Sequence, residues 1–124
     1  MGKSYTVVKV LARAFSGCTK LKTVTIGKNV TYIGTKAFVG CTKLKTATIG
    51  AGVKSIGKQA FYNCSALKKI TIKSKKLTSK NVGSRAFNGI SSKAVITVPK
   101  KKLKTYQTIF KSKGIGKKVT VVGK

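Results

Sequence analysis

The sequence contains no aspartate, no glutamate and no histidine among its 124 residues. Without carboxylates, the chain has no pair of acids for hydrolysis and no side-chain oxygen cage for calcium or magnesium. Without histidine, it lacks the usual base near neutral pH and the commonest metal ligand. Nucleophilic side chains normally need an orienting base. We therefore predict that the protein is not an enzyme, and we expect no catalytic residue, metal or cofactor.

Long apolar runs are absent too. No segment of the sequence approaches the roughly 18 consecutive apolar residues of a membrane-spanning helix, so we predict no membrane span. No signal-peptide pattern opens the chain, and we interpret Met1 and Gly2 as an artificial start.

Every charged side chain is positive: 26 lysines and two arginines give a net charge of +28. Such a surface attracts polyanions and repels itself at low salt, so we expect a monomer. Arginine matches guanine with two hydrogen bonds, whereas lysine acts as a point charge. The excess of lysine therefore predicts non-specific binding of nucleic acid in vitro rather than recognition of a base sequence.

A fixed spacing runs through most of the chain. The dipeptide Ala-Phe recurs at residues 14–15, 37–38, 60–61 and 86–87, in steps of 23, 23 and 26 residues. In the first three copies a cysteine and a leucine follow at constant offsets, as Cys18 and Leu21, Cys41 and Leu44, and Cys64 and Leu67. Self-similarity of this kind predicts a repeat protein in which each unit forms one coil of a solenoid.

Each unit also alternates apolar and polar residues over a short segment, as in Val24-Thr25-Ile26. This alternation predicts a half-buried strand with threonine outside. A shorter extended segment, residues 30–33, precedes Gly34, where we expect the chain to turn. We expect the Ala-Phe segment to form a helical or 3-10 turn that places phenylalanine in the core. One coil cannot bury its apolar face alone, so each depends on its neighbours.

The recurring pattern A-F-x-x-C-x-x-L-x-x-(V/I)-x-I, with a trailing I-G, resembles the leucine-rich repeats of the BspA type, found in surface proteins of bacteria and some protozoa. The resemblance covers residues 7 to about 98. It implies an α/β leucine-rich-repeat solenoid that is right-handed and β-rich, with a parallel sheet and short helical or 3-10 turns. It also implies a recognition or adhesion surface at an extracellular or cell-surface location.

We expect one domain, residues 1–124, with three parts: an N-terminal half-repeat at 1–13, four repeats at 14–98 and a C-terminal cap at 99–124. In the half-repeat, Val7 and Val10 take the positions that Val30 and Ile33 hold one unit later. A cap that covers the open end of the stack is what solenoids require for solubility.

The last units depart from the pattern. The third carries three extra residues, which predict a loop around Lys73–Lys80. In the fourth, Ile90 stands at the cysteine position and Lys93 at the leucine position, and residues 96–98 form a strand that Pro99 ends.

The cap itself changes period. Within residues 100–113, apolar and amide side chains recur at helical spacing: Leu103, Tyr106, Gln107, Ile109 and Phe110. Residues 114–116, Gly-Ile-Gly, are expected to stop this helix, and residues 119–122 read as a last strand.

The three cysteines have two interpretations. Their spacing of 23 residues equals the repeat length, so Cys18, Cys41 and Cys64 occupy one structural position and are interpreted as a ladder of buried thiols. The alternative is a metal or redox site, but no close C-x-x-C pair is present. An oxidised pair between neighbouring coils remains a minor alternative.

The outward face of the main sheet is the candidate binding face. Its predicted side chains are Thr23, Thr25, Thr46, Thr48, Lys69, Thr71 and Thr97, with Lys22, Lys45 and Lys68 beside them. Hydroxyl groups bordered by ammonium groups could meet sulfated or phosphorylated glycans. The alternative is that threonine simply suits exposed strand positions.

The favoured function is a non-enzymatic binding or adhesion module of a bacterial surface or secreted protein. Its partners would be anionic polymers or glycans, such as wall polymer or host glycan, and host or bacterial surface proteins. Two alternatives stay open. One is an engineered or selected cationic scaffold without a natural ligand, since a natural chain rarely lacks every Asp and Glu. The other is a non-specific nucleic-acid binder.

Overall fold

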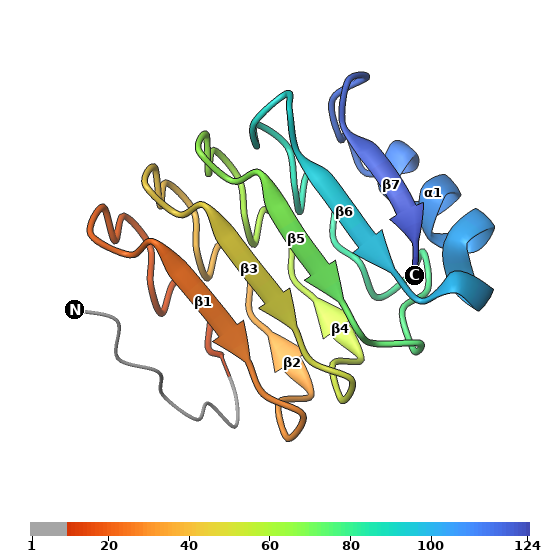
Figure 1. The fold of residues 1–124 in the computed structure, drawn as a ribbon. Helices are drawn as coiled ribbons and strands as arrows, with labels where there is room; N and C mark the ends of the chain where they lie inside the picture. The colour runs from red at the N-terminus through yellow and green to blue at the C-terminus, as the bar shows by residue number, and fades with distance from the viewer. Residues whose placement is uncertain (1–9) are drawn as a thin grey trace.

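The computed structural model describes residues 10–124 as a stack of coils that forms a solenoid (Figure 1). One wall is a five-stranded parallel sheet in the order β1-β3-β5-β6-β7. Its strands are β1 (Thr23–Ile26), β3 (Thr46–Ile49), β5 (Lys69–Ile72), β6 (Val95–Val98) and β7 (Thr120–Gly123). A second wall pairs β2 (Tyr32–Ile33) with β4 (Ser55–Ile56), again in parallel. The predicted leucine-rich-repeat solenoid is confirmed.

The strands of the main sheet keep the repeat register. Val24 pairs with Ala47, Ala47 with Ile70, and Ile70 with Ile96, so equivalent positions lie side by side. Isoleucines at the ends of β1, β3 and β5 are buried, while the intervening threonines are partly or fully exposed. Alternate side chains of a strand point to opposite faces, so one face of the sheet forms the core and the other meets solvent.

Stacked phenylalanine rings form the centre of the core. Neighbouring rings of Phe15, Phe38, Phe61 and Phe87 lie nearly parallel, with centroids 5.2, 5.0 and 5.2 Å apart. This spacing follows the separation of adjacent strands, which is about 4.8 Å. The rings of Phe38, Phe61 and Phe87 are fully buried. Each ring thus covers the next, which is how successive coils bury what one coil would expose.

The Ala-Phe segment is a run of turns and does not complete the helical or 3-10 turn that the sequence led us to expect. The residue before each Ala-Phe pair has a positive φ: Arg13, Lys36, Gln59 and Arg85. A left-handed residue interrupts a right-handed helix. Backbone N–H groups alternate between two kinds of partner. Ala37 N–H donates three residues back to the Gly34 carbonyl at 3.2 Å, whereas Phe38 N–H donates to the Ala60 carbonyl of the next coil at 2.7 Å.

Glycine allows the coils to approach closely at the corner after each short strand. A Cβ atom built on Gly57 would lie 2.4 Å from the backbone nitrogen of Thr35 in the preceding coil. No side chain fits such a space without moving backbone, so the trailing glycine is required by stacking.

The fourth coil departs from the expectation at one position. Lys93 was expected at the leucine position, but its side chain is exposed and Ala94, 1% exposed, turns inward instead. Burying an unpaired ammonium group in the core would be costly, which explains the one-residue shift. Ile90, at the cysteine position, is buried as expected.

The helix predicted for the C-terminal segment is present. A 3-10 turn, Lys100–Lys102, leads into α1 (Leu103–Ser112), which buries Tyr106, Ile109 and Phe110. Phe110 meets Phe87 edge-on, with centroids 5.4 Å apart and planes at 83°. The edge-on contact thus ends the parallel stack of rings at α1, which lies at the C-terminal side of the stack (Figure 1). After α1, β7 pairs in parallel with β6.

The loop with three extra residues is anchored to this helix. Ser74, 0% exposed, is the only buried polar side chain in residues 10–124, and its hydroxyl donates to the Val53 carbonyl. The Tyr106 hydroxyl donates to the Ser74 carbonyl at 2.8 Å and accepts from the Leu77 N–H at 3.2 Å. The insertion is therefore bonded both to the second coil, at Val53, and to α1, at Tyr106.

At the N-terminal side, Val10 bridges to Ile33 and is buried, as the half-repeat predicts. Val7, the other predicted half-repeat position, lies outside the described residues.

Replacing Phe61 by alanine should lower the free energy of unfolding by about 3–5 kcal/mol, because the substitution leaves a cavity between two rings. Phe15→Ala is the matched control, since Phe15 is half-buried and stacks on one ring. Its loss should be clearly smaller in urea unfolding at fixed salt. Equal losses would contradict the stacked-ring core.

Tyr106→Phe should destabilise the protein by about 1–3 kcal/mol near neutral pH, because it leaves the Ser74 carbonyl and Leu77 N–H without their buried partner. Burial raises the pKa of Tyr106 above its ordinary value near 10. The unfolded chain therefore releases this proton first, so the wild type loses stability relative to Tyr106→Phe as pH rises above about 10. Urea titrations at pH 8 and pH 11 measure the difference, which should shrink. A constant difference would contradict the buried, protonated phenol.

Candidate binding face

Two rows of side chains cross the solvent-facing side of the main sheet. The first row, in strand order, contains Thr23, Thr46, Lys69, Val95 and Thr120. The second contains Thr25, Thr48, Thr71, Thr97 and Val122. The structure therefore brings all the predicted face residues together on one surface, because equal repeat length fixes the register of the parallel strands.

Four threonines of the second row form a continuous line. Thr25 is exposed, and Thr48, Thr71 and Thr97 are half-buried between neighbouring strands. Their hydroxyl groups form no side-chain hydrogen bond with any described residue. These hydroxyl groups are therefore free to donate to or accept from a ligand or water.

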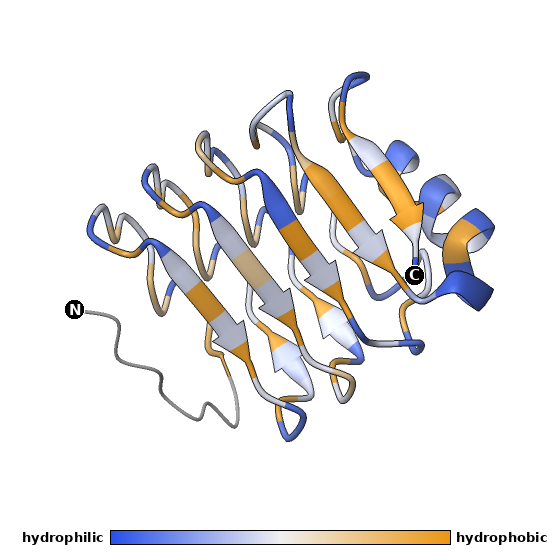
Figure 2. Ribbon diagram, in the orientation of Figure 1, coloured by the Kyte–Doolittle hydropathy of each residue, from blue (hydrophilic) through white to orange (hydrophobic). Residues whose placement is uncertain are grey.

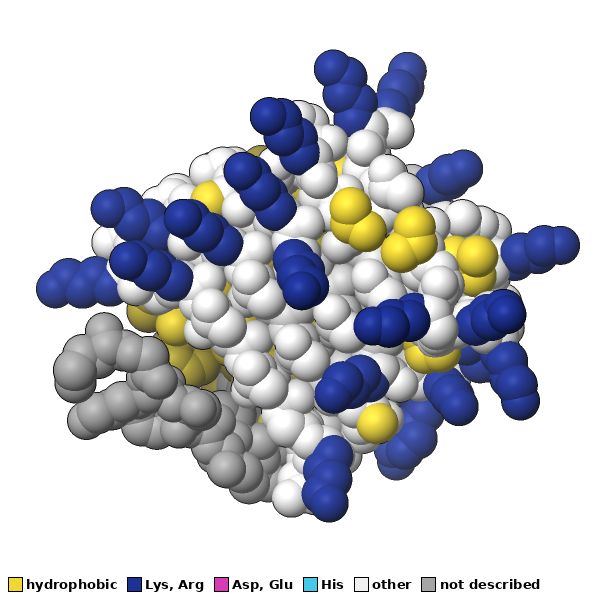
Figure 3. Space-filling model, viewed as in Figure 1, with side chains coloured by type: hydrophobic (Ala, Val, Ile, Leu, Met, Phe, Trp, Pro, Cys, Tyr) yellow, Lys and Arg dark blue, Asp and Glu magenta, His cyan; other side chains and the backbone are white. Residues whose placement is uncertain are grey.

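Lysines border these rows where the strands begin. Lys22, Lys45 and Lys68 are exposed and lie in successive coils, since Lys45 N–H bonds to the Lys22 carbonyl at 2.8 Å and Lys68 N–H to the Lys45 carbonyl at 3.1 Å. Figure 3 shows lysine and arginine side chains around and across this face, with no acidic side chain among them. Like charges on neighbouring coils repel one another through water. A polyanion lying along this column would relieve that repulsion.

Two apolar residues on this face were not predicted from the sequence. Val95, 38% exposed, follows Lys69 in the first row, and Val122 follows Thr97 in the second. Figure 2 shows β6 and β7 more strongly hydrophobic than β1 and β3. The sequence pattern could have predicted both positions. Alternation along a strand places Val95 on the same side as Thr97 and Val122 on the same side as Thr120.

The cysteines form the predicted ladder in the core. Cys41 and Cys64 are fully buried, and their Sγ atoms donate to the Phe15 and Phe38 carbonyls, both at 3.1 Å. Cys18 is half-buried, and all three thiols are free. Burial raises the pKa of Cys18, and an interaction with Cys41 together with burial raises that of Cys64. The same pair interaction lowers the pKa of Cys41, so it is burial that keeps the Cys41 thiol from reacting.

Within residues 10–124, no three metal-ligating side chains gather at one place. Nor is any helix in that part of the chain long and apolar enough to cross a bilayer.

A stack of parallel coils with one solvent-facing sheet defines a repeat scaffold of the leucine-rich class. The sequence matches the model of the BspA type leucine-rich repeat region, in six copies over residues 4–116. This chain therefore belongs to that family. Leucine-rich-repeat domains are typically non-enzymatic scaffolds that bind proteins, and the BspA type is typically associated with cell surfaces.

A crystal structure of a leucine-rich repeat protein from T. pallidum is similar to this chain, with 21% sequence identity and a TM-score of 0.48. The similarity covers 94% of this chain and 67% of that one. No curated protein matches the sequence.

A maleimide reagent near neutral pH should label Cys18 first in the folded protein, since only this thiol is partly exposed. Cys41 and Cys64 should react only after unfolding in urea. Mass spectrometry counts the labels, and Cys18→Ser should abolish the reaction of the folded state. Simultaneous labelling of all three would contradict the buried ladder.

Proposed function

We propose that this protein is a non-enzymatic binding module of a bacterial surface or secreted protein, and that its outer sheet face holds an anionic polymer or glycan. The observation that carries this proposal is the aligned face itself. Four threonine hydroxyls lie in one row beside a column of lysines, with no acidic side chain in the chain to neutralise them. Hydroxyl and ammonium groups together suit sulfate and phosphate esters.

The shape of the face supports an extended partner. Equivalent residues repeat from strand to strand at about 4.8 Å, so the row from Thr25 to Thr97 presents a series of similar contacts. Polymers with a regular series of charges meet such a row at several points, and several weak contacts add to one useful affinity. Mutual repulsion at a net charge of +28 favours a monomer without its ligand.

A glycan array and a pull-down with anionic wall polymer, both at about 150 mM salt, test the proposal. We expect sulfated or phosphorylated glycans, or the wall polymer, to be retained, since contacts from hydroxyl groups persist when salt screens long-range attraction. Duplex DNA serves as a comparison, because non-specific binding shows a steep salt slope and no sequence preference. Loss of all glycan and wall-polymer binding at this salt would remove the proposal, and retention of DNA alone would favour the nucleic-acid alternative.

The triple variant Lys22→Gln, Lys45→Gln, Lys68→Gln should weaken binding of the retained polymer about tenfold, because three exposed ion pairs contribute roughly 0.5 kcal/mol each. The matched control replaces Lys101, Lys104 and Lys111, which are also exposed but lie in the C-terminal 3-10 turn and α1. Both variants lose three charges, so a difference between them locates the site. Equal losses measured by calorimetry would mean that net charge alone governs binding.

A further inference from the structure

The regular pairing between the third and fourth strands of the main sheet, β5 and β6, ends one residue before the strands do. Pairing of β1 with β3 extends to Ile26 and Ile49, and pairing of β6 with β7 extends to Val98 and Gly123. Pairing of β5 with β6 stops one residue earlier, at Thr71 and Thr97. The sheet therefore has one local opening, at the carboxyl ends of these two strands.

Pro99 explains this opening. The residue after β5, Lys73, donates its N–H to the Ile49 carbonyl at 2.8 Å, and the residue after β7, Lys124, donates to the Val98 carbonyl at 3.0 Å. Proline follows β6 and has no N–H, so the equivalent bond to the Ile72 carbonyl cannot form. This contact is present between β3 and β5 and between β6 and β7, and proline excludes it between β5 and β6.

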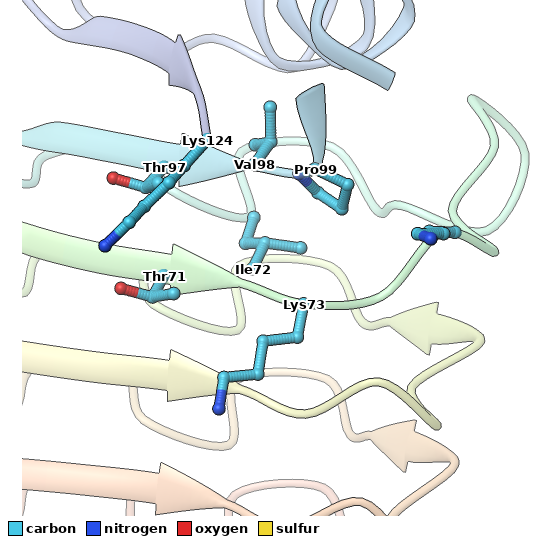
Figure 4. A pocket seen from close by; sticks show the side chains of 8 residues that line it. Thr71, Ile72, Lys73, Thr97, Val98, Pro99 and Lys124 are labelled. Carbon is cyan, nitrogen blue, oxygen red and sulfur yellow. The ribbon is translucent and has the colours of Figure 1, made fainter. Parts of the chain in front are cut away.

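A pocket of about 380 Å³ lies at this opening. Its lining residues are Thr71, Ile72, Lys73, Lys75, Thr97, Val98, Pro99 and Lys124 (Figure 4). Pro99 is the partly exposed apolar residue, because the side chains of Ile72 and Val98 are only 2% and 1% exposed. Three lysines and two threonines provide the polar groups. Ligand pockets of this size commonly combine an apolar lining with a few polar groups that orient the ligand.

Two of the lysines flank the pocket because of the repeat. Lys73 and Lys124 occupy the same repeat position as Pro99, on the strands to either side of β6. Their backbones are two strand spacings apart, about 10 Å, which leaves room for one sugar ring. In the first two coils this position is Gly27 and Gly50, so no such pair of ammonium groups exists there. Figure 4 shows the hydroxyls of Thr71 and Thr97 projecting to the same side, with Lys124 beside Thr97.

We propose that this pocket binds a single sugar residue that carries a tetrahedral oxyanion ester, either sulfate or phosphate. The apolar C–H face of the sugar packs on Pro99, and the ester lies beside the ammonium group of Lys124, within reach of Thr97. The Lys73 side chain, which Figure 4 shows directed toward the neighbouring strand, turns toward the ester when it binds. The inference rests on the proposed function and places one specific contact at the end of the threonine row.

Glucose 6-sulfate and glucose 6-phosphate are suitable probes, titrated at about 150 mM salt while amide resonances are followed by NMR. We expect shifts at Thr71 and Thr97, and at least tenfold weaker binding of glucose and of inorganic sulfate. A preference for the sulfate ester would indicate a sulfated glycan, and a preference for the phosphate ester a phosphorylated one. If neither ester binds, or if shifts appear only at Lys22 and Lys45, the pocket is not the site.

Two double variants and one single variant distinguish binding in the pocket from attraction by net charge. Lys73→Gln with Lys124→Gln should weaken binding of the preferred ester at least tenfold, whereas Lys20→Gln with Lys43→Gln, which removes the same charge elsewhere, should change it less than twofold. Pro99→Ala restores a backbone N–H and keeps every lysine, so it should close the opening and also weaken binding. Equal losses in the two double variants, or full binding by Pro99→Ala, would overturn the proposal.

These outcomes are distinct from failure of the proposed function. Retention of polymers without binding of either monosaccharide ester would leave the threonine and lysine face in place and remove only the pocket. Binding of a monosaccharide ester without retention of any polymer would support the pocket and remove the proposal that the face holds a polymer.

Discussion

Stacking of one coil on the next is the interaction on which the rest of the structure depends. A coil alone exposes one face of its phenylalanine and its strand residues, and only a neighbour of the same shape covers them. Phe38 and Phe61 show the result, with rings 5.0 Å apart and nearly parallel. Backbone hydrogen bonds and glycine corners, such as Gly57, set the same separation. Because these contacts act between neighbours, stability accumulates along the stack.

The same constraint explains how the chain tolerates its charge. Among residues 10–124, every lysine and arginine lies outside the core, and the one buried polar side chain is the uncharged Ser74. Repulsion between ammonium groups therefore acts through water and is screened by salt. Where the repeat would have placed Lys93 inside, the backbone shifts by one residue and Ala94 enters instead. Core packing thus excludes charged side chains, so the lysines lie on the surface.

Regular stacking also forms the candidate binding face. Interruptions of the repeat make one end of that face different from the rest. Equal repeats align Thr25, Thr48, Thr71 and Thr97, while the insertion after β5 is absorbed by a loop tied to Tyr106. At Pro99 one backbone contact is missing, and there the otherwise continuous sheet opens. A regular surface suits repetitive polymers, whereas a single irregular site can distinguish one unit of such a polymer.

The sequence by itself determined the 23-residue period, the inward ladder of phenylalanine and cysteine, and the outward threonines, because side-chain alternation and equal spacing leave few arrangements. Tertiary structure alone decided three further points. Left-handed residues such as Gln59 prevent a helical turn at Ala-Phe, because backbone groups bond to the next coil. Ala94 takes the buried position of the fourth coil in place of Lys93, because burial of an unpaired ammonium group would be costly. The pocket beside Pro99 requires Lys73 and Lys124, which are 51 residues apart in sequence, to lie on either side of β6, and only the stacked strands place them there.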